Sequence, residues 1–517
     1  MTTPFLFVPV FSWPTAPGGK LHTYAAGGTT PQGTWSDAAG AVPNTNPVTL
    51  DSNGDAVVRL TSGLAYHFVL KDSTDTTTLW DTDNYQASYL TQSDIGTLLY
   101  PRTTAEIAAS VTPTNYAYEP GNVLRYGADP AGSTDSTAAF TSAGLTGYLI
   151  YAPRGTYKVS SGITITGGGI RGDGSYLTNI NTTDTGNNNV FLYTGSLAGV
   201  FRDFSLNLAT TKTGGYGIVV GPASGEVSGV RFLHVVINGL PNHISFTRAS
   251  LWSVVACNFY GYTGDAIKVD NQNNADSGDS VISSCQFTSP GNTAANSIEQ
   301  VASGGLKIVG NKFNNAGVHV LLNLGINSTS DLIISGNSFE NAHFDAIQLQ
   351  RQGGSSALFQ NVVVTGNQFL VSSASGTSSG VYSNNGASFL SGLTIVGNNF
   401  RISDTGGATG ILLDYVSDFT VSGNDIIGNA GTSLGIDIGT HNTAGMLGIN
   451  RVSGCGTNYS IPSGIPNINP ISETGWGVPT GNSVVTNFPG ASATLGQCSA
   501  TIAQIITDLK TMGVYLT

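Results

Sequence analysis

Charged side chains are scarce in this chain. They make up 10 % of its 517 residues, and 31 acidic residues face only 19 basic ones. Because no basic surface is available to neutralise phosphates, the composition argues against a nucleic-acid partner, and the net charge of −12 argues against binding to anionic lipid. The four cysteines, at positions 257, 285, 455 and 498, are too few for a disulfide scaffold and form no CxxC metal motif.

A targeting segment and a membrane helix are also missing. The first ten residues contain Pro4 and Pro9 but no basic residue, so they do not resemble a signal peptide. No apolar run approaches the ~20 residues that a membrane helix needs, so no membrane insertion is expected. We therefore expect synthesis in the cytoplasm and, for any role outside, export as part of a larger assembly. The 68 glycines, with 40 % hydrophobic residues, favour a turn-rich all-β protein over disorder.

What the chain does have is an internal repeat of about 27 residues. Its first series is Phe204, Phe232, Phe259, Phe287, Phe313, Phe339, Phe369 and Phe400, continued by Ile426 and Val452. Its second series, two positions earlier, is Asn311, Asn337, Asn367, Asn398, Asn424 and Asn450, preceded by Cys257 and Cys285. Amides in successive coils can hydrogen-bond to one another, so each Asn is predicted to form a corner between strands and each Phe to lie in the core. The two cysteines are interpreted as buried free thiols.

A third series of segments follows the phenylalanines. Segments such as Ala266–Val269 and Ala346–Leu349 alternate in polarity with a period of two, which is typical of half-buried strands. Three series of short strands without a helical pattern predict an all-β fold, a parallel β-solenoid of about twelve coils.

Residues 122–175 resemble the beginning of the pectate-lyase-like superfamily of right-handed parallel β-helices. The similar segments are 122–140, 151–157 and 170–175. In that family the first segment forms a strand, a turn and a helix that plugs the end of the barrel. Ser133 to Asp135 can cap such a helix here, and a solenoid needs a cap to avoid an open edge.

Residues 18–85 resemble the head domain of phage tailspikes and tail fibres. The similar segments are 19–27, 35–40, 46–51, 53–56 and 66–72, and residues 100–113 resemble phage linkers. In those proteins the head binds the virion. The resemblance implies a small β-rich head at 1–90, a linker at 91–121, a β-helix with its capping helix at 122–460 and a C-terminal helical trimerisation segment at 461–517. We accordingly expect a homotrimer in the virion tail that is made in the host cytoplasm and acts outside the host cell.

In that family the third series of strands faces the polysaccharide groove. Its outward positions are predicted to be Ser245, Lys268, Glu299, His319, Gln348, Tyr382, Leu412 and Asp437. Lys268, His319, Gln348 and Tyr382 form a polar stripe, and together with Arg351 they are the candidate substrate-binding residues. The alternative is an ordinary solvated face.

Glycoside hydrolysis usually needs two carboxyl groups that flank the scissile bond. Asp270 and Glu299 are one coil and two positions apart, which predicts a separation of ~8 Å, within the ~6.5–9.5 Å of inverting enzymes. Asp414 and Asp437 have the same relation and form the second candidate pair. Asp265 and Asp345, where their strands begin, are interpreted as turn caps.

The sequence thus predicts a phage tailspike depolymerase that cleaves a bacterial capsule or O-antigen within the chain by hydrolysis. Three alternatives stay open: a lyase with Lys268, His319, Tyr382 or Arg351 as its polar groups, a receptor-binding spike without chemistry, and a secreted pectinase. No acidic cluster is dense enough to predict calcium, so no metal or other cofactor is expected.

Overall fold

The computed structural model describes residues 5–6, 10–86 and 92–462, apart from short gaps at 197, 222–223, 271–277, 303, 326–327, 353–356, 373–377, 385–389 and 404–405. The chain divides between Pro101 and Arg102 into two compact units. The predicted linker, 91–121, straddles this division, and nearly all of the predicted trimerisation segment lies outside the described residues. Within the described part, no helix has the length and hydrophobicity to cross a membrane.

The first unit is an antiparallel β domain. Its main sheet has the strand order β4 (Val48–Thr49), β3 (Lys20–Ala25), β7 (Ala65–Lys71) and β8 (Thr78–Gln86). Two short pairs accompany it: β1 (Phe5–Leu6) with β6 (Leu60–Thr61), and β2 (Phe11–Ser12) with β5 (Asp55–Ala56). Alternate residues of β3 and β7, among them Leu21, Tyr66 and Leu70, are fully buried and form the core of this unit. Helix α1 (Gln92–Leu99) follows the sheet.

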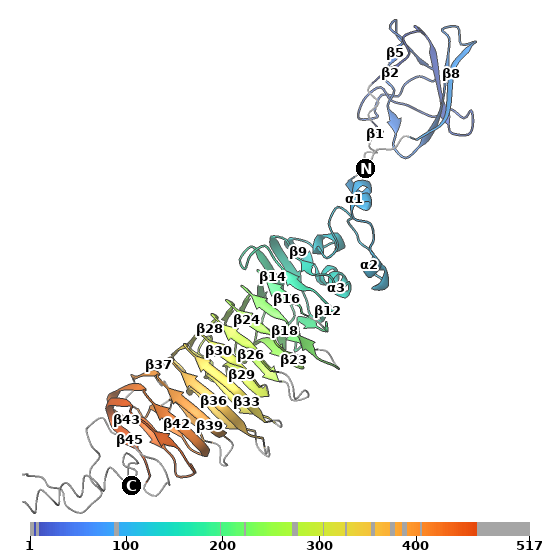
Figure 1. The fold of residues 1–517 in the computed structure, drawn as a ribbon. Coiled ribbons are helices and arrows are strands. Elements are labelled where there is room, and N and C mark those ends of the chain that lie inside the picture. Colours follow the sequence, from blue (N-terminus) through green and yellow to red (C-terminus); the bar gives the residue numbers. More distant parts are fainter. Residues whose placement is uncertain are drawn as a thin grey trace, which may run out of the picture. The chain divides into compact units, whose positions relative to one another are not determined.

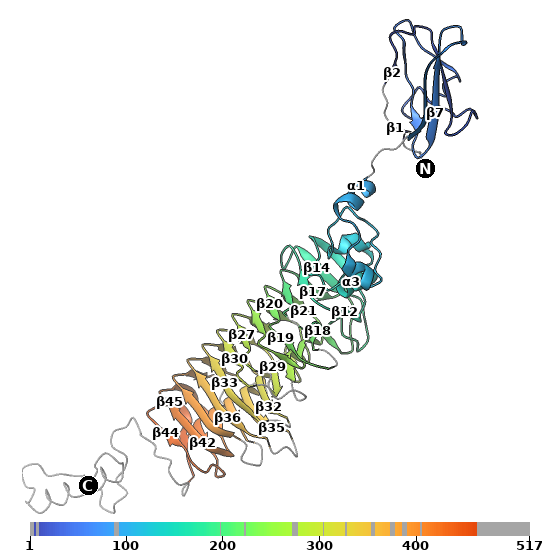
Figure 2. The ribbon, with the colours of Figure 1, turned by 45° about the vertical axis from the view of Figure 1, so that its right-hand side comes forward.

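The second unit is a parallel β-helix whose coils stack in sequence order (Figures 1 and 2). The first of its three faces is a continuous twelve-stranded parallel sheet, which confirms the predicted solenoid of about twelve coils. This first face consists of β10 (Ile150–Tyr151), β13 (Gly169–Arg171), β16 (Val200–Arg202), β20 (Arg231–Leu233), β24 (Ser253–Val255), β27 (Val281–Ser283), β30 (Lys307–Val309), β33 (Thr329–Ser335), β36 (Phe359–Thr365), β39 (Leu390–Val396), β42 (Val416–Ser422) and β44 (Met446–Leu447).

Two further faces complete each coil. The second face consists of β9 (Ala131–Asp135), β11 (Gly155–Val159), β14 (Thr178–Thr182), β17 (Ser205–Leu208), β21 (Val236–Asn238), β25 (Asn258–Tyr260), β28 (Gln286–Thr288), β31 (Lys312–Asn314), β34 (Ser338–Glu340), β37 (Gln368–Val371) and β40 (Asn399–Ile402). The third face consists of β12 (Ile163–Ile165), β15 (Phe191–Tyr193), β18 (Tyr216–Val220), β22 (Asn242–Phe246), β26 (Asp265–Asp270), β29 (Asn296–Ala302), β32 (Val318–Leu324), β35 (Asp345–Arg351), β38 (Ser379–Ser383) and β41 (Thr409–Leu413). The long strands β43 (Asp425–Ile438) and β45 (Arg451–Ser460) bridge these two faces. A short parallel pair, β19 (Val227–Ser228) and β23 (Ala249–Ser250), lies in the segments that lead from the third face back to the first.

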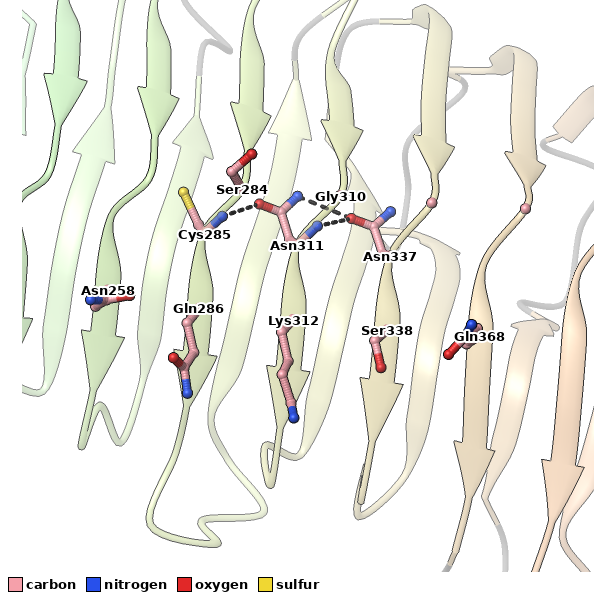
Figure 3. A pocket seen from close by; sticks show the side chains of 12 residues that line it. Asn258, Ser284, Cys285, Gln286, Gly310, Asn311, Lys312, Asn337, Ser338 and Gln368 are labelled. Carbon is pink, nitrogen blue, oxygen red and sulfur yellow. Dashed lines mark hydrogen bonds between the residues drawn. The ribbon is translucent and has the colours of Figure 1, made fainter.

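The predicted asparagine corner joins the first face to the second. The Asn311 amide nitrogen donates to the Asn337 amide oxygen in the next coil at 3.0 Å (Figure 3). The Asn337 amide donates to Asn367 in the same way, at 3.0 Å. The backbone N–H of Asn337 donates to the same Asn367 oxygen at 2.9 Å. Cys257 and Cys285 occupy this corner in earlier coils as free, buried thiols, as the sequence predicts. These bonds satisfy the backbone groups that the turn leaves unpaired.

The predicted phenylalanine core is a stack of rings behind that corner. Phe313 lies 4.8 Å from Phe287 and 4.9 Å from Phe339 between ring centroids, with nearly parallel planes. The series is wrong at its first two members. Phe232 lies on the first face, where its ring stacks on that of Phe201 with centroids 4.8 Å apart. Phe204 lies in the corner position, because its backbone oxygen accepts a hydrogen bond from the Val236 N–H. The early coils have different lengths, so the spacing from Phe259 cannot be extended backwards.

Helix α3 (Thr137–Leu145) covers the beginning of the solenoid, as the family resemblance implies (Figure 1). The Asp135 carboxylate accepts a hydrogen bond at 2.6 Å from the N–H of Thr137, the first residue of the helix, although the N-cap residue itself is Ser136. Phe140 is fully buried against Tyr157, with ring centroids 5.6 Å apart. A Cβ at Gly144 would lie 2.3 Å from the Thr164 backbone oxygen, so only glycine lets the helix approach the strand this closely.

A buried ion pair fastens the segment before the solenoid. Glu106, in α2 (Thr104–Ala108), and Arg125, in the 3-10 helix η1 (Val123–Tyr126), are both fully buried, with Nε and Oε1 2.7 Å apart. The Tyr126 hydroxyl donates to the same oxygen at 2.8 Å. Although burial opposes ionisation, the bonds from Arg125, Thr103 and Tyr126 lower the pKa of Glu106.

Candidate functional site

The outward positions of the third face follow most of the predicted register. Ser245 pairs with Lys268 and Lys268 with Glu299 across β22, β26 and β29. Farther along, Gln348 pairs with Tyr382, Tyr382 with Leu412 and Leu412 with Asp437. Because parallel strands lie ~4.8 Å apart, these side chains form one row along the solenoid.

The predicted outward placement of His319 is wrong. Leu321, not His319, pairs with Glu299 on one side and Gln348 on the other. His319 is fully buried between Phe313 and Phe339, and its Nε2 lies 2.9 Å from the backbone oxygen of Glu340. Burial lowers the pKa of His319 to about 4. The neutral ring is therefore part of the core and not of a substrate groove.

Lys268 and Glu299 form an ion pair in the middle of the row. Lys268 Nζ lies 2.8 Å from Glu299 Oε2, and the two side chains are 26 % and 10 % exposed. Asn323, one coil on, donates from Nδ2 to Glu299 Oε1 at 2.9 Å. Burial alone would lower the pKa of Lys268, but the carboxylates of Glu299, Asp265 and Asp270 raise it above its usual value. The lysine is thus a persistent cation in a largely desolvated place.

Asp265, at the beginning of β26, joins this ion pair from the side. Its Oδ1 accepts from Asn296 Nδ2 at 2.9 Å, and its Oδ2 accepts from the Tyr216 hydroxyl at 3.4 Å. Burial, and then the negative charge of Glu299, raises the pKa of Asp265 to about 6. Because two neighbouring carboxyl groups do not both ionise easily, Asp265 keeps its proton to a higher pH than an isolated aspartate does.

Asp270, expected to be the partner of Glu299, belongs to the same electrostatic cluster but has a different register. The pairing of β26 with β29 shifts after Val269, so Asp270 lies opposite Ala302. The Asp270 carboxylate raises the pKa of both Lys268 and Tyr216. Asp270 therefore lies near the Lys268–Glu299 ion pair, at the end of β26, whose first residue is Asp265.

Asp345 is the buried carboxyl at the beginning of β35. Its Oδ1 accepts from the backbone N–H of Ser379 in the next coil at 2.9 Å, which fits the predicted capping role. The Asn242 side chain accepts from the Asp265 N–H in the same way, also at 2.9 Å. Burial raises the pKa of Asp345 to about 7, so the acid is about half protonated at neutral pH.

The remaining predicted site residues lie farther along the third face. Gln348 donates from Nε2 to Gln350 at 3.4 Å, Arg351 pairs with Leu324, and burial raises the pKa of Tyr382. At the far end, Asp414 forms a 2.9 Å hydrogen bond with His441 Nδ1, while Asp437 pairs in register with Leu412. The Asp414 carboxylate is thus hydrogen-bonded to a histidine from the next coil.

Sequence reasoning missed Asp265 as a functional residue because a single Asp before a strand is usually a turn cap. The signal that could have found it is the row of polar residues at the beginning of successive strands: Tyr216 pairs with Asn242, and Asp265 pairs with Asn296. Among the residues that the structure describes, no group of three or more metal-binding side chains comes together.

Comparison with known proteins supports the fold. No protein-family model matches the chain, and no curated protein matches its sequence. The solved A-module of the mannuronan C-5 epimerase AlgE4 from Azotobacter vinelandii is similar over 68 % of this chain and 99 % of its own length, with a TM-score of 0.53 and 16 % identity. DFA-IIIase from Arthrobacter chlorophenolicus without its lid matches 68 % of this chain and 98 % of its own, with a TM-score of 0.46 and 15 % identity. ORF18 of Geobacillus virus E2 matches 76 % and 67 %, with a TM-score of 0.35 and 16 % identity. At 16 % identity, the similarity to the epimerase module shows a similar fold and nothing about activity.

Proposed function

We propose that this chain is a phage tailspike depolymerase that hydrolyses a bacterial capsule or O-antigen polysaccharide within the chain. The observation that carries the proposal is the pair of neighbouring carboxyls, half-buried Asp265 and buried Glu299, in which burial and the charge of Glu299 raise the pKa of Asp265 to about 6 beside the cation of Lys268. Glycoside hydrolysis needs one protonated and one ionised carboxyl at the scissile bond. The polar side chains of the surrounding row, which Leu321 and Leu412 interrupt, suit a hydroxyl-rich polymer.

The two carboxyls have separate roles in this proposal. Asp265 donates its proton to the glycosidic oxygen, and Glu299 attacks the anomeric carbon to form a glycosyl-enzyme ester as the leaving chain departs. Asp265, now ionised, then takes a proton from the water that hydrolyses the ester, which regenerates both groups. Because the charge of Glu299 acts strongly on Asp265, we place these two carboxyls nearer together than the ~6.5–9.5 Å of inverting enzymes. We therefore propose retention of anomeric configuration in place of the inversion that Asp270 and Glu299 imply.

The other predicted residues keep binding roles. Asp270 and Lys268 contact the sugar at the scissile bond, and Gln348, Tyr382 and Arg351 bind units farther along the row. Successive coils advance by ~4.8 Å, which is of the order of one sugar unit, so several side chains reach neighbouring units of an extended chain. Asp414 and Asp437 are the second candidate carboxyl pair at the far end of this row.

A lyase is less well supported. β-Elimination needs a neutral or anionic base, yet the pKa of Lys268 and the pKa of Tyr382 are both raised, and His319 is buried in the core. These three were the bases predicted for that reaction. The name of the epimerase module whose fold is similar includes mannuronan, a uronic-acid polymer, so acidic polysaccharides belong in the substrate panel.

The proposed biological setting rests on the sequence resemblance of residues 18–85 to tailspike heads. We propose a homotrimer that is made in the host cytoplasm, attached to the virion tail through the head and active outside the host cell. The bacterial surface polysaccharide is its partner.

The proposal is tested with Asp265→Asn and Glu299→Gln on purified capsules and O-antigens from a panel of bacteria. We expect each variant to lose about 10²–10⁴-fold in the formation of reducing ends, the usual contribution of an acid or base. Asp418→Asn, at an exposed carboxyl on β42 of the first face, is the matched control and should keep most activity. Proton NMR of the first products should show retained anomeric configuration.

Three outcomes contradict parts of the proposal. Full activity in both variants rejects the Asp265–Glu299 pair. If Asp414→Asn then loses activity, the catalytic site lies at the far end of the third face. Products that absorb ultraviolet light as unsaturated uronates identify a lyase. No cleavage of a polymer that the protein binds leaves a receptor-binding spike.

A further inference from the structure

A hollow lies along the asparagine corner, between the first and second faces and apart from the row on the third face. Its volume is about 540 Å³. Its lining residues are Asn258, Ser284, Cys285, Gln286, Gly310, Asn311, Lys312, Gly336, Asn337, Ser338, Gly366 and Gln368. It therefore extends across five successive coils, from β25 to β37.

Glycine forms the floor of this hollow. Gly310, Gly336 and Gly366 precede the corner asparagines and have φ values of +67°, +65° and +65°. The same turn is made by Ala256 at +52° and Ser284 at +56°, so the left-handed conformation does not by itself require glycine. A Cβ at Gly310 would meet nothing within 4 Å. The repeated absence of a side chain thus leaves open space over the backbone.

Amide, hydroxyl and ammonium side chains form the wall. Gln286, Lys312, Ser338 and Gln368 follow one another on successive strands of the second face and project beside the floor (Figure 3). A second hollow of about 320 Å³ shares Ser338 and Gln368 and continues to Arg401. The two hollows form one groove, which we call the corner groove.

The chemistry of the corner groove suits neutral, hydroxyl-rich ligands. Amides and hydroxyls both donate and accept hydrogen bonds, as sugar hydroxyls do. The first hollow contains no carboxyl group and no aromatic ring, so it lacks the means for acid–base cleavage and the anchors typical of protein interfaces. In the second hollow, Glu340 Oε1 lies 3.5 Å from Lys312 Nζ, which balances the nearest cation.

We propose that the corner groove is a second, non-catalytic binding site for an extended segment of neutral polysaccharide. The choice of a polysaccharide rests on the proposed function, but the groove and its lining do not. Bound here, one stretch of polymer keeps the protein on the bacterial surface while another stretch occupies the third face.

The test uses the full chain with Glu299→Gln, so that polymer is bound without being cleaved. Two changes are added separately: Ser338→Trp, which fills the groove, and the pair Gln286→Ala and Gln368→Ala, which removes hydrogen-bonding groups. Thr420→Trp, an outward, half-buried position on β42 of the first face, is the matched control. Binding of the same panel of capsules and O-antigens is measured by calorimetry and by electrophoresis in polymer-containing gels.

We expect both groove variants to bind at least one polymer about tenfold more weakly and Thr420→Trp to bind it normally. Unchanged affinity in both groove variants, or binding of no polymer by the parent, overturns the inference. A groove variant whose oligomeric state in light scattering differs from that of the parent also overturns the inference, because the groove would then be a subunit interface. Groove-dependent binding without cleavage by the unmodified chain would reject the proposed hydrolysis and retain the groove.

Discussion

On the third face, burial and neighbouring charge determine which carboxyl keeps a proton. Asp265 and Asp345 begin equivalent strands, and burial is the largest cause of the raised pKa of each. Only Asp265 also feels the charge of a second carboxyl, Glu299, and only Asp265 has a cation nearby, Lys268. Two residues of one type at equivalent positions thus have different chemistry.

We expect cleavage to decline as pH rises through about 6, because Asp265 must be protonated to act as the acid. Lys268 lowers the pKa of Asp265, so Lys268→Met should move this decline to higher pH. The measurement is the initial rate of reducing-end formation against pH for both proteins. A decline at the same pH in the variant would show that another group titrates.

Asp345 gives a prediction about stability. Its pKa is raised in the folded protein, so its stabilising contribution is complete below the ordinary value of 3.8 and is lost as pH rises through about 7. Asp345→Asn keeps an acceptor for the Ser379 N–H but cannot ionise. Between about pH 6 and pH 8 we expect the variant to gain of the order of 1 kcal/mol over the parent, since one pKa unit is worth about 1.4 kcal/mol. Thermal denaturation across this range checks it, and a constant difference would contradict it.

The sequence predicted the ion-pair residues Lys268 and Glu299 side by side, because both lie on regular alternating strands. It could not place His319, since the register between coils depends on loop length. Val320, not Val318, pairs with Ile298, so His319 takes the position of Ser297 and Ala346, which are buried near the beginning of their strands. Nor could it identify Asp265, whose raised pKa comes from burial and from the charge of Glu299 in the next coil.

At the level of strands and turns, the asparagine corner gives successive coils the same hydrogen-bonding pattern. Asn367 accepts two bonds from Asn337, and it donates to Asn398 Oδ1 at 3.0 Å and to the Ile334 backbone oxygen at 2.9 Å. This part of the fold was predictable from the sequence because a buried amide with four partners tolerates few replacements. The early coils use cysteine and apolar residues instead, and the prediction failed there at Phe204 and Phe232.

Removing one amide from the corner should destabilise the protein measurably. Asn367→Leu leaves the buried N–H of Asn337 without an acceptor, at about 1–3 kcal/mol per unsatisfied group. Asn367→Cys should cost less, because the Cys285 thiol accepts from the Cys257 N–H at 3.5 Å in an earlier coil. The exposed neighbour Gln368→Ala is the control and should change stability by less than about 0.5 kcal/mol. Equal losses in the leucine and cysteine variants, measured by denaturant unfolding, would contradict this account.

For the whole molecule, the division at Pro101 separates two units with their own cores. The head core includes Leu21 and Tyr66, while the Glu106–Arg125 pair belongs to the second unit. The sequence predicted the head from its resemblance alone, because its short strands carry no repeat that composition or spacing could reveal.

We expect a chain that begins at Arg102 to keep full depolymerase activity and to lose incorporation into virions. The reason is that each unit has a separate core, so deletion of the first leaves the second intact. Reducing-end assays and complementation of spike-deficient particles measure the two properties, with the full chain as control. Both chains should be trimers by light scattering. Incorporation of the shortened chain would contradict attachment through the head.

The corner hydrogen bonds connect residues only 26 to 31 positions apart in the chain, although the solenoid is more than 300 residues long. Each coil therefore needs nothing that lies far downstream. Helix α3, the plug, leaves the ribosome before every coil that stacks behind it. The second unit can thus assemble during translation, one coil at a time, with each finished coil serving as the template for the next.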